Sequence, residues 1–228
     1  MRPNVARPPT ESMPTAPSLL STLRLRHLGT RNYTDCWQDM KVFTEQRQPQ
    51  DPDELWLLQH PPVYTLGLNG DATHLLHADS APLVHTDRGG QITWHGPGQL
   101  VAYTLLDIRR KNLGVRALVT RLESAVIDLL AAFGLPAAAR QDAPGVYVEG
   151  RKIASIGLRV RKGCTYHGIS LNVDPDLSAF DRINPCGYPG LIVSSLQQEG
   201  IPVHADEVMP GLATAIMNQL AYEACIGQ

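Results

Sequence analysis

Cysteine is the first residue type in this 228-residue sequence that could do covalent chemistry. Cys186 lies in the segment INPCGYPG, whose two prolines and two glycines predict a rigid, irregular loop of the kind that often displays a nucleophile. Cys36 and Cys225 fall within helical patterns and are interpreted as inert core residues, whereas Cys164 lies on a predicted hairpin turn. Cys186 is therefore the best candidate nucleophile of the four, with an inert core thiol as the alternative.

Lysine is scarce in the sequence, with 4 lysines against 16 arginines, so the surroundings of each lysine are informative. Lys152 lies in GVYVEGRKIASIGLRV, where strand alternation places it on one face with Ala154 and Ile156. A lysine among small and apolar groups loses hydration, which makes its amine able to accept a proton. The alternative is a lysine on an edge strand with its amine in water.

A glycine-rich segment, RGGQITWHGPGQ, covers residues 88–99. Glycines let the backbone approach a ligand closely, and a plain surface loop would not favour Trp and His, so we interpret the segment as a binding loop. It contains neither a Walker motif nor GxGxxG, which leaves a nucleotide site without support. Thr93–Gly96 is echoed by Thr165–Gly168, since both read Thr-aromatic-His-Gly. Unless this is coincidence, two strand ends present His and Gly to one pocket.

The elements that must position these residues can be read from hydrophobic periodicity. Their strands cluster in runs without strict βαβ alternation, which predicts an α+β fold with a mixed sheet and flanking helices. A single domain is expected over residues 19–228, after a Pro-rich tail over residues 1–18 that is predicted to be disordered. Strands are predicted over residues 23–28, 53–59, 83–86, 100–108, 145–148, 152–160 and 166–173, and helices over 33–46, 115–133 and 205–222.

Composition excludes several classes of protein. The net charge is −2 and no stretch concentrates basic residues, so nucleic acid is not the expected partner. No CxxC pair occurs, which argues against zinc and leaves no metal site expected. No apolar run approaches the roughly 18 residues of a membrane span, and no secretory segment is recognised. We therefore expect a cytoplasmic protein with reduced thiols.

Four segments together resemble one family. RGGQITWHGPGQ, GRKIASIGLRV, TYHGISLNV and INPCGYPG occur in the order and at the spacing of the lipoyl(octanoyl) transferases, the octanoyl-[acyl-carrier-protein]:protein N-octanoyltransferases. The resemblance runs from about Leu23 to the C-terminal helix. It departs at Trp94, where the family more often has Tyr, Phe or His, and at Ser170, where Ala is common. The implied fold is that of the biotin and lipoate protein ligases.

The resemblance also implies an activity. An octanoyl group would move from acyl carrier protein to a lysine on lipoyl domains of 2-oxoacid dehydrogenases and of the glycine cleavage H protein. Cys186 would carry the group as a thioester, and Lys152 would be the general acid/base. No cofactor, ATP or metal is expected, because one thioester is exchanged for another. The implied substrate contacts are Arg88, Gly89, Gly90, Gln91, Ile92, Thr93, Trp94, His95, Ser155, Ile156, Gly157, Gly168, Ile169 and Ser170.

Trp94 is the bulkiest apolar residue among these contacts, so we expect it to limit the length of the acyl chain. Three other functions stay open. A lipoate–protein ligase of the same fold would use ATP and would not need Cys186. A non-catalytic module would bind lipoyl domains without needing Cys186 or Lys152. A cysteine hydrolase would pair its thiol with a histidine, for which His95 and His167 are candidates.

Overall fold

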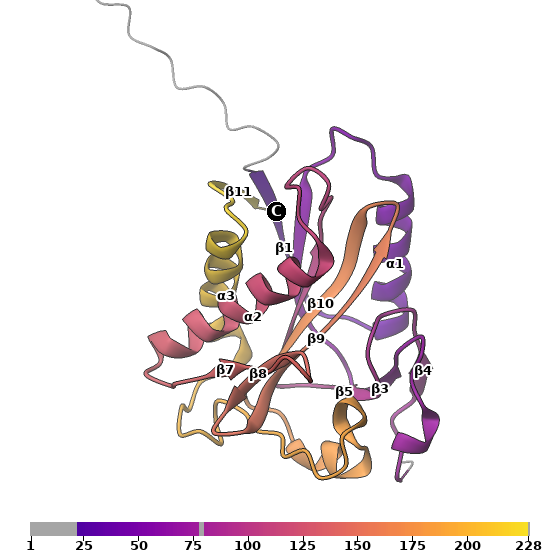
Figure 1. The fold of residues 1–228 in the computed structure, drawn as a ribbon, viewed down its shortest axis with the longest axis vertical. Helices are drawn as coiled ribbons and strands as arrows, with labels where there is room; N and C mark the ends of the chain where they lie inside the picture. Colours follow the sequence, from indigo (N-terminus) through magenta and orange to yellow (C-terminus); the bar gives the residue numbers. More distant parts are fainter. Residues whose placement is uncertain (1–21, 78–79, 228) are drawn as a thin grey trace, which may run out of the picture.

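The described part of the chain forms two β-sheets with three α-helices around them (Figure 1). The structure is a computed structural model, and it describes residues 22–77 and 80–227. The predicted tail over residues 1–18 and the predicted domain start at residue 19 lie outside these ranges. Within them the fold is α+β with a mixed sheet and flanking helices, which confirms the predicted class.

The large sheet has its strands in the order β11-β1-β2-β6-β10-β9-β8-β7. β1 runs parallel to β2 and β11, whereas the other neighbouring strands are antiparallel. The strands are β1 (Thr22–Thr30), β2 (Asp53–Gln59), β6 (Gln99–Leu105), β7 (Ala138–Ala139), β8 (Gly145–Val148), β9 (Arg151–Arg161), β10 (Cys164–Asn172) and β11 (Ala224–Gly227). Of the residues with candidate chemistry, Lys152 lies on β9 and His167 on β10 of this sheet.

The small sheet has the order β4-β3-β5, with β3 at Val63–Leu66, β4 at Leu83–His85 and β5 at Thr93–His95. Neither β3, which follows Pro61 and Pro62, nor β5, which lies inside the glycine-rich segment, was predicted from the sequence. β5 pairs antiparallel with β3, so the glycine-rich segment is anchored on a strand and is not a free loop. The chain also forms short 3₁₀ helices: η1 (Ala72–His74) lies between β3 and β4, and η2 (Leu177–Arg182) and η3 (Pro185–Gly187) come after β10.

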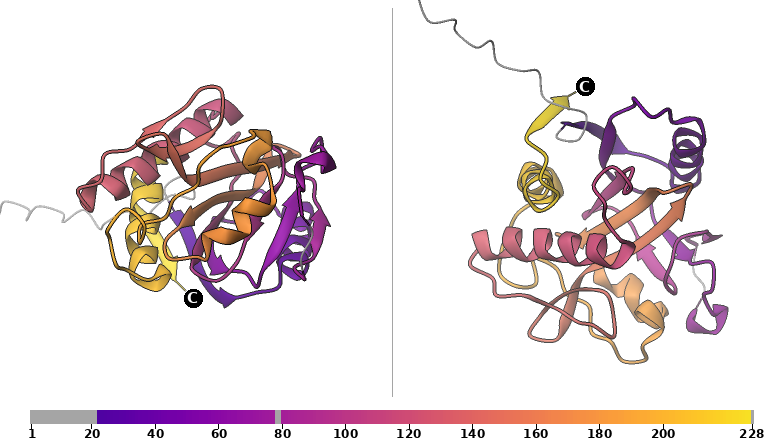
Figure 2. Two further views of the ribbon diagram at one scale, coloured as in Figure 1. Left: turned by 90° about the horizontal axis from the view of Figure 1, so that it is seen from below. Right: turned by 45° about the horizontal axis from the view of Figure 1, so that its top comes forward.

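Helices cover both faces of the large sheet: α2 (Val115–Ala132) and α3 (Ala205–Gln219) lie on one face, and α1 (Tyr33–Gln46) on the other (Figure 2). β2 shows the reason in its sequence, DELWLLQ. Leu55 and Leu57 pack in the core with α2 and α3, whereas Trp56 and Leu58 pack with Met40 of α1. A strand covered on both faces has a continuous apolar run in place of strict alternation.

The helix ends follow from local residues. Asn32 caps α1, because its side chain accepts a hydrogen bond from the backbone N–H of Thr34 at 2.9 Å. α3 ends at Gln219, where the chain turns through Ala221 at φ 53° and enters β11. The predicted helix over residues 205–222 was therefore too long. Cys225, predicted to be a helical core residue, is exposed on β11.

The other thiols are buried or half-buried. Cys36 belongs to α1 and is fully buried against the sheet, as predicted. Cys164 is also buried, because the hairpin turn is made by Lys162 and Gly163, both at positive φ, and Cys164 already belongs to β10. The prediction that placed Cys164 on the turn itself was wrong. Within the described residues, no helix combines the length and apolarity that a bilayer crossing requires.

Candidate active site

Lys152 is buried in the middle of the large sheet, with only 2% of its surface exposed. β9 lies between β10 and β8, so Lys152 is not on an edge strand, and its amine is not in water. The pairing of β9 with β8 shifts at this point: Tyr147 lies opposite Lys152 and Val146 opposite Ala154, which leaves Ile153 as an extra residue. This bulge breaks the predicted alternation, because Ile153 and Ala154 both enter the core while Lys152 faces away.

Cys186 lies in η3 with a left-handed backbone, at φ 57° and ψ 17°. A non-glycine residue in this region is uncommon and is held only by its surroundings. Here Gly187 also has positive φ, and the backbone N–H of Cys186 donates to the carbonyl of Ile92 at 3.2 Å. The irregular backbone predicted from INPCGYPG is confirmed, and the hydrogen bond to Ile92 joins this loop to the glycine-rich segment.

The two candidate residues meet across the site. The amine of Lys152 lies 3.0 Å from the Sγ of Cys186, 2.8 Å from the carbonyl oxygen of Pro144 and 3.3 Å from the hydroxyl of Tyr147. The backbone fixes this approach, because residues after Cys186 run beside β9: the N–H of Lys152 donates to Ile192 at 2.8 Å, and its carbonyl accepts from Ser194 at 2.9 Å. The loop that carries Cys186 is thereby attached to β9 at the lysine itself.

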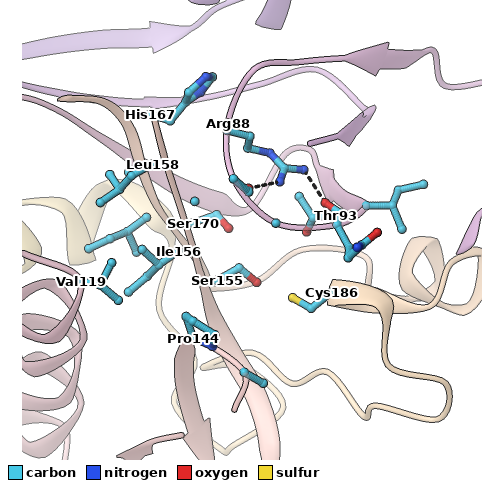
Figure 3. A pocket seen from close by; sticks show the side chains of 18 of the residues that line it. Arg88, Thr93, Val119, Pro144, Ser155, Ile156, Leu158, His167, Ser170 and Cys186 are labelled. Carbon is cyan, nitrogen blue, oxygen red and sulfur yellow. Dashed lines mark hydrogen bonds between the residues drawn. The ribbon is translucent and has the colours of Figure 1, made fainter. Parts of the chain in front are cut away.

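A cavity of about 340 Å³ opens beside Cys186 (Figure 3). Ser155 and Ser170 point from the sheet toward the side where Cys186 and Thr93 lie, whereas Ile156 and Leu158 lie on the opposite side of the strands with Val119. The sequence-predicted contacts in its wall are Arg88, Gly89, Gly90, Gln91, Ile92, Thr93, His95, Ser155, Ile156, Gly157, Gly168, Ile169 and Ser170. The structure thus brings three separate segments together around one cavity.

The side chain of Arg88 binds the backbone of the glycine-rich segment. Its guanidinium is buried and donates to the backbone carbonyls of Thr65 at 2.6 Å, Gly89 at 2.9 Å and Gln91 at 2.9 Å. Burying an arginine is costly unless its donors are paired, and here the terminal nitrogens bond two carbonyls of the glycine-rich segment and the carbonyl and hydroxyl of Thr65 in β3. Arg88 therefore holds the loop in the shape that lines the cavity.

The two Thr-aromatic-His-Gly repeats do converge on one pocket. Tyr33 stacks against both histidines, with ring centroids 5.6 Å from His95 and 6.5 Å from His167. Burial lowers the pKa of both imidazoles, His95 well below its usual value. His95 bonds to Gln99 at 2.6 Å and His167 to Asp87 at 3.2 Å. Both rings line the cavity as neutral groups whose hydrogen-bond partners are Gln99 and Asp87, and the Nδ1 of His167 is buried without a partner among the described residues. The thiol of Cys186 has its contact with the Lys152 amine instead, so the geometry favours a Cys-Lys pair over the Cys-His pair of a hydrolase.

Trp94 does not line the cavity, which corrects the expectation that it contacts the acyl chain. Alternation along β5 turns Thr93 and His95 toward the cavity and Trp94 to the other side. Its ring packs edge-to-face on Phe180 at 5.7 Å, within a small core that also contains Tyr64. The prediction failed because β5 was read as a loop, and a loop gives no rule for which side chains share a face.

Several residues of the site were missed by sequence analysis. Tyr33, Val101 and Tyr103 line the cavity from α1 and β6 with no motif to mark them. Tyr147 could have been found from the sequence, because it lies in the predicted strand over residues 145–148, and the short turn at Glu149-Gly150 pairs that strand with the one that contains Lys152. The bulge in β9 decides that it faces Lys152, and nothing in the sequence marked that bulge.

Comparison with known proteins gives one consistent result. The sequence model of the lipoyl protein ligase A/B catalytic domain matches residues 32–217. The chain is 56% identical over 197 residues to an octanoyltransferase from Alkalilimnicola ehrlichii, covering 86% of this chain and 92% of that protein. It is 57% identical over 199 residues to an octanoyltransferase from Methylococcus capsulatus, covering 87% and 96%.

Solved structures agree at the level of the fold. A lipoate-protein ligase A bound with ATP matches with a TM-score of 0.74 at 18% identity, covering 89% of this chain and 88% of that one. A biotin protein ligase from Aquifex aeolicus matches with a TM-score of 0.52 at 12% identity, covering 87% and 70%. With its fold, its paired cysteine and lysine, and relatives this similar over most of their length, the chain belongs to the lipoyl protein ligase A/B catalytic domain family and, within it, to the octanoyltransferases, which are acyltransferase enzymes.

Proposed function

We propose that the chain takes an octanoyl group from octanoyl-acyl carrier protein onto Cys186 and passes it to a lysine of a lipoyl domain. The single observation that supports this best is the 3.0 Å contact between the Lys152 amine and the Cys186 thiol at the edge of the cavity. A nucleophile within hydrogen-bond reach of a group that can take its proton is the arrangement that covalent acyl transfer needs.

In the first step the proton of the Cys186 thiol moves to the amine of Lys152. The resulting thiolate attacks the thioester carbonyl of the donor, and the ammonium beside it offsets the charge of the thiolate. The carrier sulfur then leaves with the electron pair of the broken C–S bond and takes the proton back from Lys152. Cys186 is left as an octanoyl thioester, and Lys152 is neutral again.

In the second step the neutral amine of the acceptor lysine attacks that thioester. Lys152 accepts the proton that this nitrogen loses as the C–N bond forms. The C–S bond breaks, the Cys186 sulfur leaves with its electron pair, and the proton on Lys152 returns to it. The products are an amide on the lipoyl domain and the free thiol. Both steps exchange bonds already activated by the donor thioester, so we propose that no ATP, metal or other cofactor takes part.

The cavity offers a place for the acyl chain. Its volume of about 340 Å³ is in the range of small-molecule sites, which is about 300–1,000 Å³. An octanoyl group has seven carbons beyond the carbonyl, and burying them contributes roughly 5 kcal/mol. The ordered glycine-rich segment and β9 would hold the chain, while the half-buried Cys186 stays within reach of the carrier and acceptor proteins.

One comparison separates this function from the ATP-dependent ligase of the same fold. The protein is incubated with a lipoyl domain and either octanoyl-acyl carrier protein without ATP, or free octanoate with ATP and magnesium. We expect octanoylated lipoyl domain in the first mixture only, with Cys186→Ala inactive. Product in the second mixture only would overturn the proposal in favour of a ligase. A protein that binds the lipoyl domain and modifies it in neither mixture would be a binding module.

A further inference from the structure

The amine of Lys152 has as many acceptors around it as an ammonium has hydrogens. An ammonium carries three N–H donors, and the three neighbours are the Pro144 carbonyl at 2.8 Å, the Tyr147 hydroxyl at 3.3 Å and the Cys186 sulfur at 3.0 Å. Pro144 and Tyr147 are structural partners that do not react, whereas the Cys186 sulfur is the reactive atom. The three directions around the nitrogen are therefore chemically different.

The two structural partners can only accept from Lys152. A backbone carbonyl has no hydrogen to give. The hydroxyl of Tyr147 has one, but it donates that hydrogen to the carbonyl of Ala143 at 2.8 Å. Burial raises the pKa of Tyr147, so the phenol keeps its hydrogen at neutral pH. The oxygen of Tyr147 is thus left with its lone pairs toward the lysine.

We propose that Tyr147 is a positioning residue that, with the Pro144 carbonyl, aims the lone pair of neutral Lys152 at the sulfur of Cys186. A neutral amine has two N–H bonds and one lone pair. Since Pro144 and Tyr147 each hold one N–H, the lone pair has only the direction of Cys186 left. This inference rests on the proposed function and deepens it, because the lone pair then faces both the thiol proton and the amine that attacks the thioester.

Of the two acceptors that hold the Lys152 amine, only Tyr147 can be removed by a substitution. Pro144 contributes through its backbone, which a substitution cannot remove, whereas the hydroxyl of Tyr147 can be deleted without changing the ring. A second cation on this side is Arg140, whose guanidinium lies 5.1 Å from the centre of the Tyr147 ring and pairs with Asp142 at 2.6 Å. The Lys152 amine lies 5.2 Å from that centre, so Tyr147→Phe keeps both ring contacts. The substitution removes the acceptor for Lys152 together with the hydrogen bond that the hydroxyl donates to the Ala143 carbonyl, so its control must also lose a bond from a buried hydroxyl to a carbonyl.

The first measurement is the steady-state kinetics of Tyr147→Phe. We expect kcat to fall about tenfold, which is the effect of one hydrogen bond to a charged group, with KM for the acyl donor unchanged. The pH dependence of Cys186 alkylation by iodoacetamide, followed by peptide mass spectrometry, should also move to higher pH, because the ammonium loses an acceptor. The matched control is Tyr64→Phe, which loses a bond from a buried hydroxyl to the Ala179 carbonyl, 3.1 Å in length, away from the site. Tyr64→Phe should keep the wild-type kcat and the wild-type pH dependence of Cys186 alkylation.

A double-mutant cycle then decides whether Tyr147 acts through the lysine. In a Lys152→Ala background, adding Tyr147→Phe should leave the alkylation of Cys186 unchanged. An equal effect of Tyr147→Phe with and without Lys152, or no effect on kcat and alkylation in the wild-type background, would overturn the proposal. Tyr147→Met takes the place of Tyr147→Phe if that variant does not fold. Alkylation requires no acyl donor, so it tests Tyr147 even if octanoyl transfer itself were to fail.

Discussion

The amine of Lys152 fills the space that a side chain at position 145 would need. A β-carbon on Gly145 would lie 2.9 Å from the Lys152 nitrogen and 2.5 Å from the carbonyl oxygen of Ala154. Gly145 also has φ +140°, a conformation that other residues rarely adopt. Gly145, the first residue of β8, therefore leaves the space in which the lysine side chain reaches Cys186.

Replacing Gly145 by alanine should displace that amine. We expect Gly145→Ala to lower octanoyl transfer by at least tenfold, because an error of about 1 Å in a catalytic group is costly. Gly150→Ala is the matched control, since Gly150 has φ +84° but open space around it. It should cost about 1 kcal/mol of stability from backbone strain and leave turnover intact. Equal turnover in the two variants would contradict the assigned position of the lysine.

Lys152→Arg separates charge from proton transfer. Arginine keeps a cation beside Cys186 but cannot be deprotonated at neutral pH. We expect Cys186 alkylation to stay within a few-fold of wild type, while transfer to the lipoyl domain falls at least a hundredfold. Both are measured on the same preparation after its melting temperature has been recorded. Transfer at the normal rate in this variant would reduce Lys152 to an electrostatic role.

Trp94→Ala should affect stability and not chain length. Trp94 packs on Phe180 outside the cavity, so truncation should cost about 3–5 kcal/mol of unfolding free energy. In competition between octanoyl and dodecanoyl donors, the folded variant should give the wild-type ratio of products. Ser170→Leu provides the contrast, because Ser170 lines the cavity and a larger side chain there should favour shorter donors. A changed ratio in Trp94→Ala alone would mean that Trp94 does reach the acyl chain.

Trp94 and Lys152 show which features of the fold and the site could be predicted from the sequence and which could not. Hydrophobic periodicity located α1, β2 and β8 to the residue, and motif spacing selected Cys186 and Lys152. The features that the sequence could not predict depend on pairing between strands that are distant along the chain or out of register. β5 exists because β3, thirty residues earlier, pairs with it, and Trp94 points away from the cavity for that reason alone. The bulge that turns Lys152 toward Cys186 likewise appears only when β8 is set against β9.

The four thiols should differ in reactivity. Burial raises the pKa of Cys36 to about 12 and also raises the pKa of Cys164, so neither forms much thiolate near neutral pH. Brief iodoacetamide treatment of the folded protein at pH 8 should label Cys186 and the exposed Cys225, as determined by peptide mass spectrometry. Cys36 and Cys164 should react only after denaturation. Labelling of Cys36 as fast as that of Cys186 would contradict the burial of the Cys36 side chain.

The most direct test of the covalent mechanism is the mass of the protein after incubation with octanoyl-acyl carrier protein in the absence of an acceptor. We expect intact-protein mass spectrometry to show the addition of one octanoyl group, mapped to Cys186, present in Cys164→Ala and absent in Cys186→Ala. Adding a lipoyl domain should remove the group from the enzyme as the domain gains it. Octanoyl transfer by Cys186→Ala at the wild-type rate would contradict a thioester on this residue.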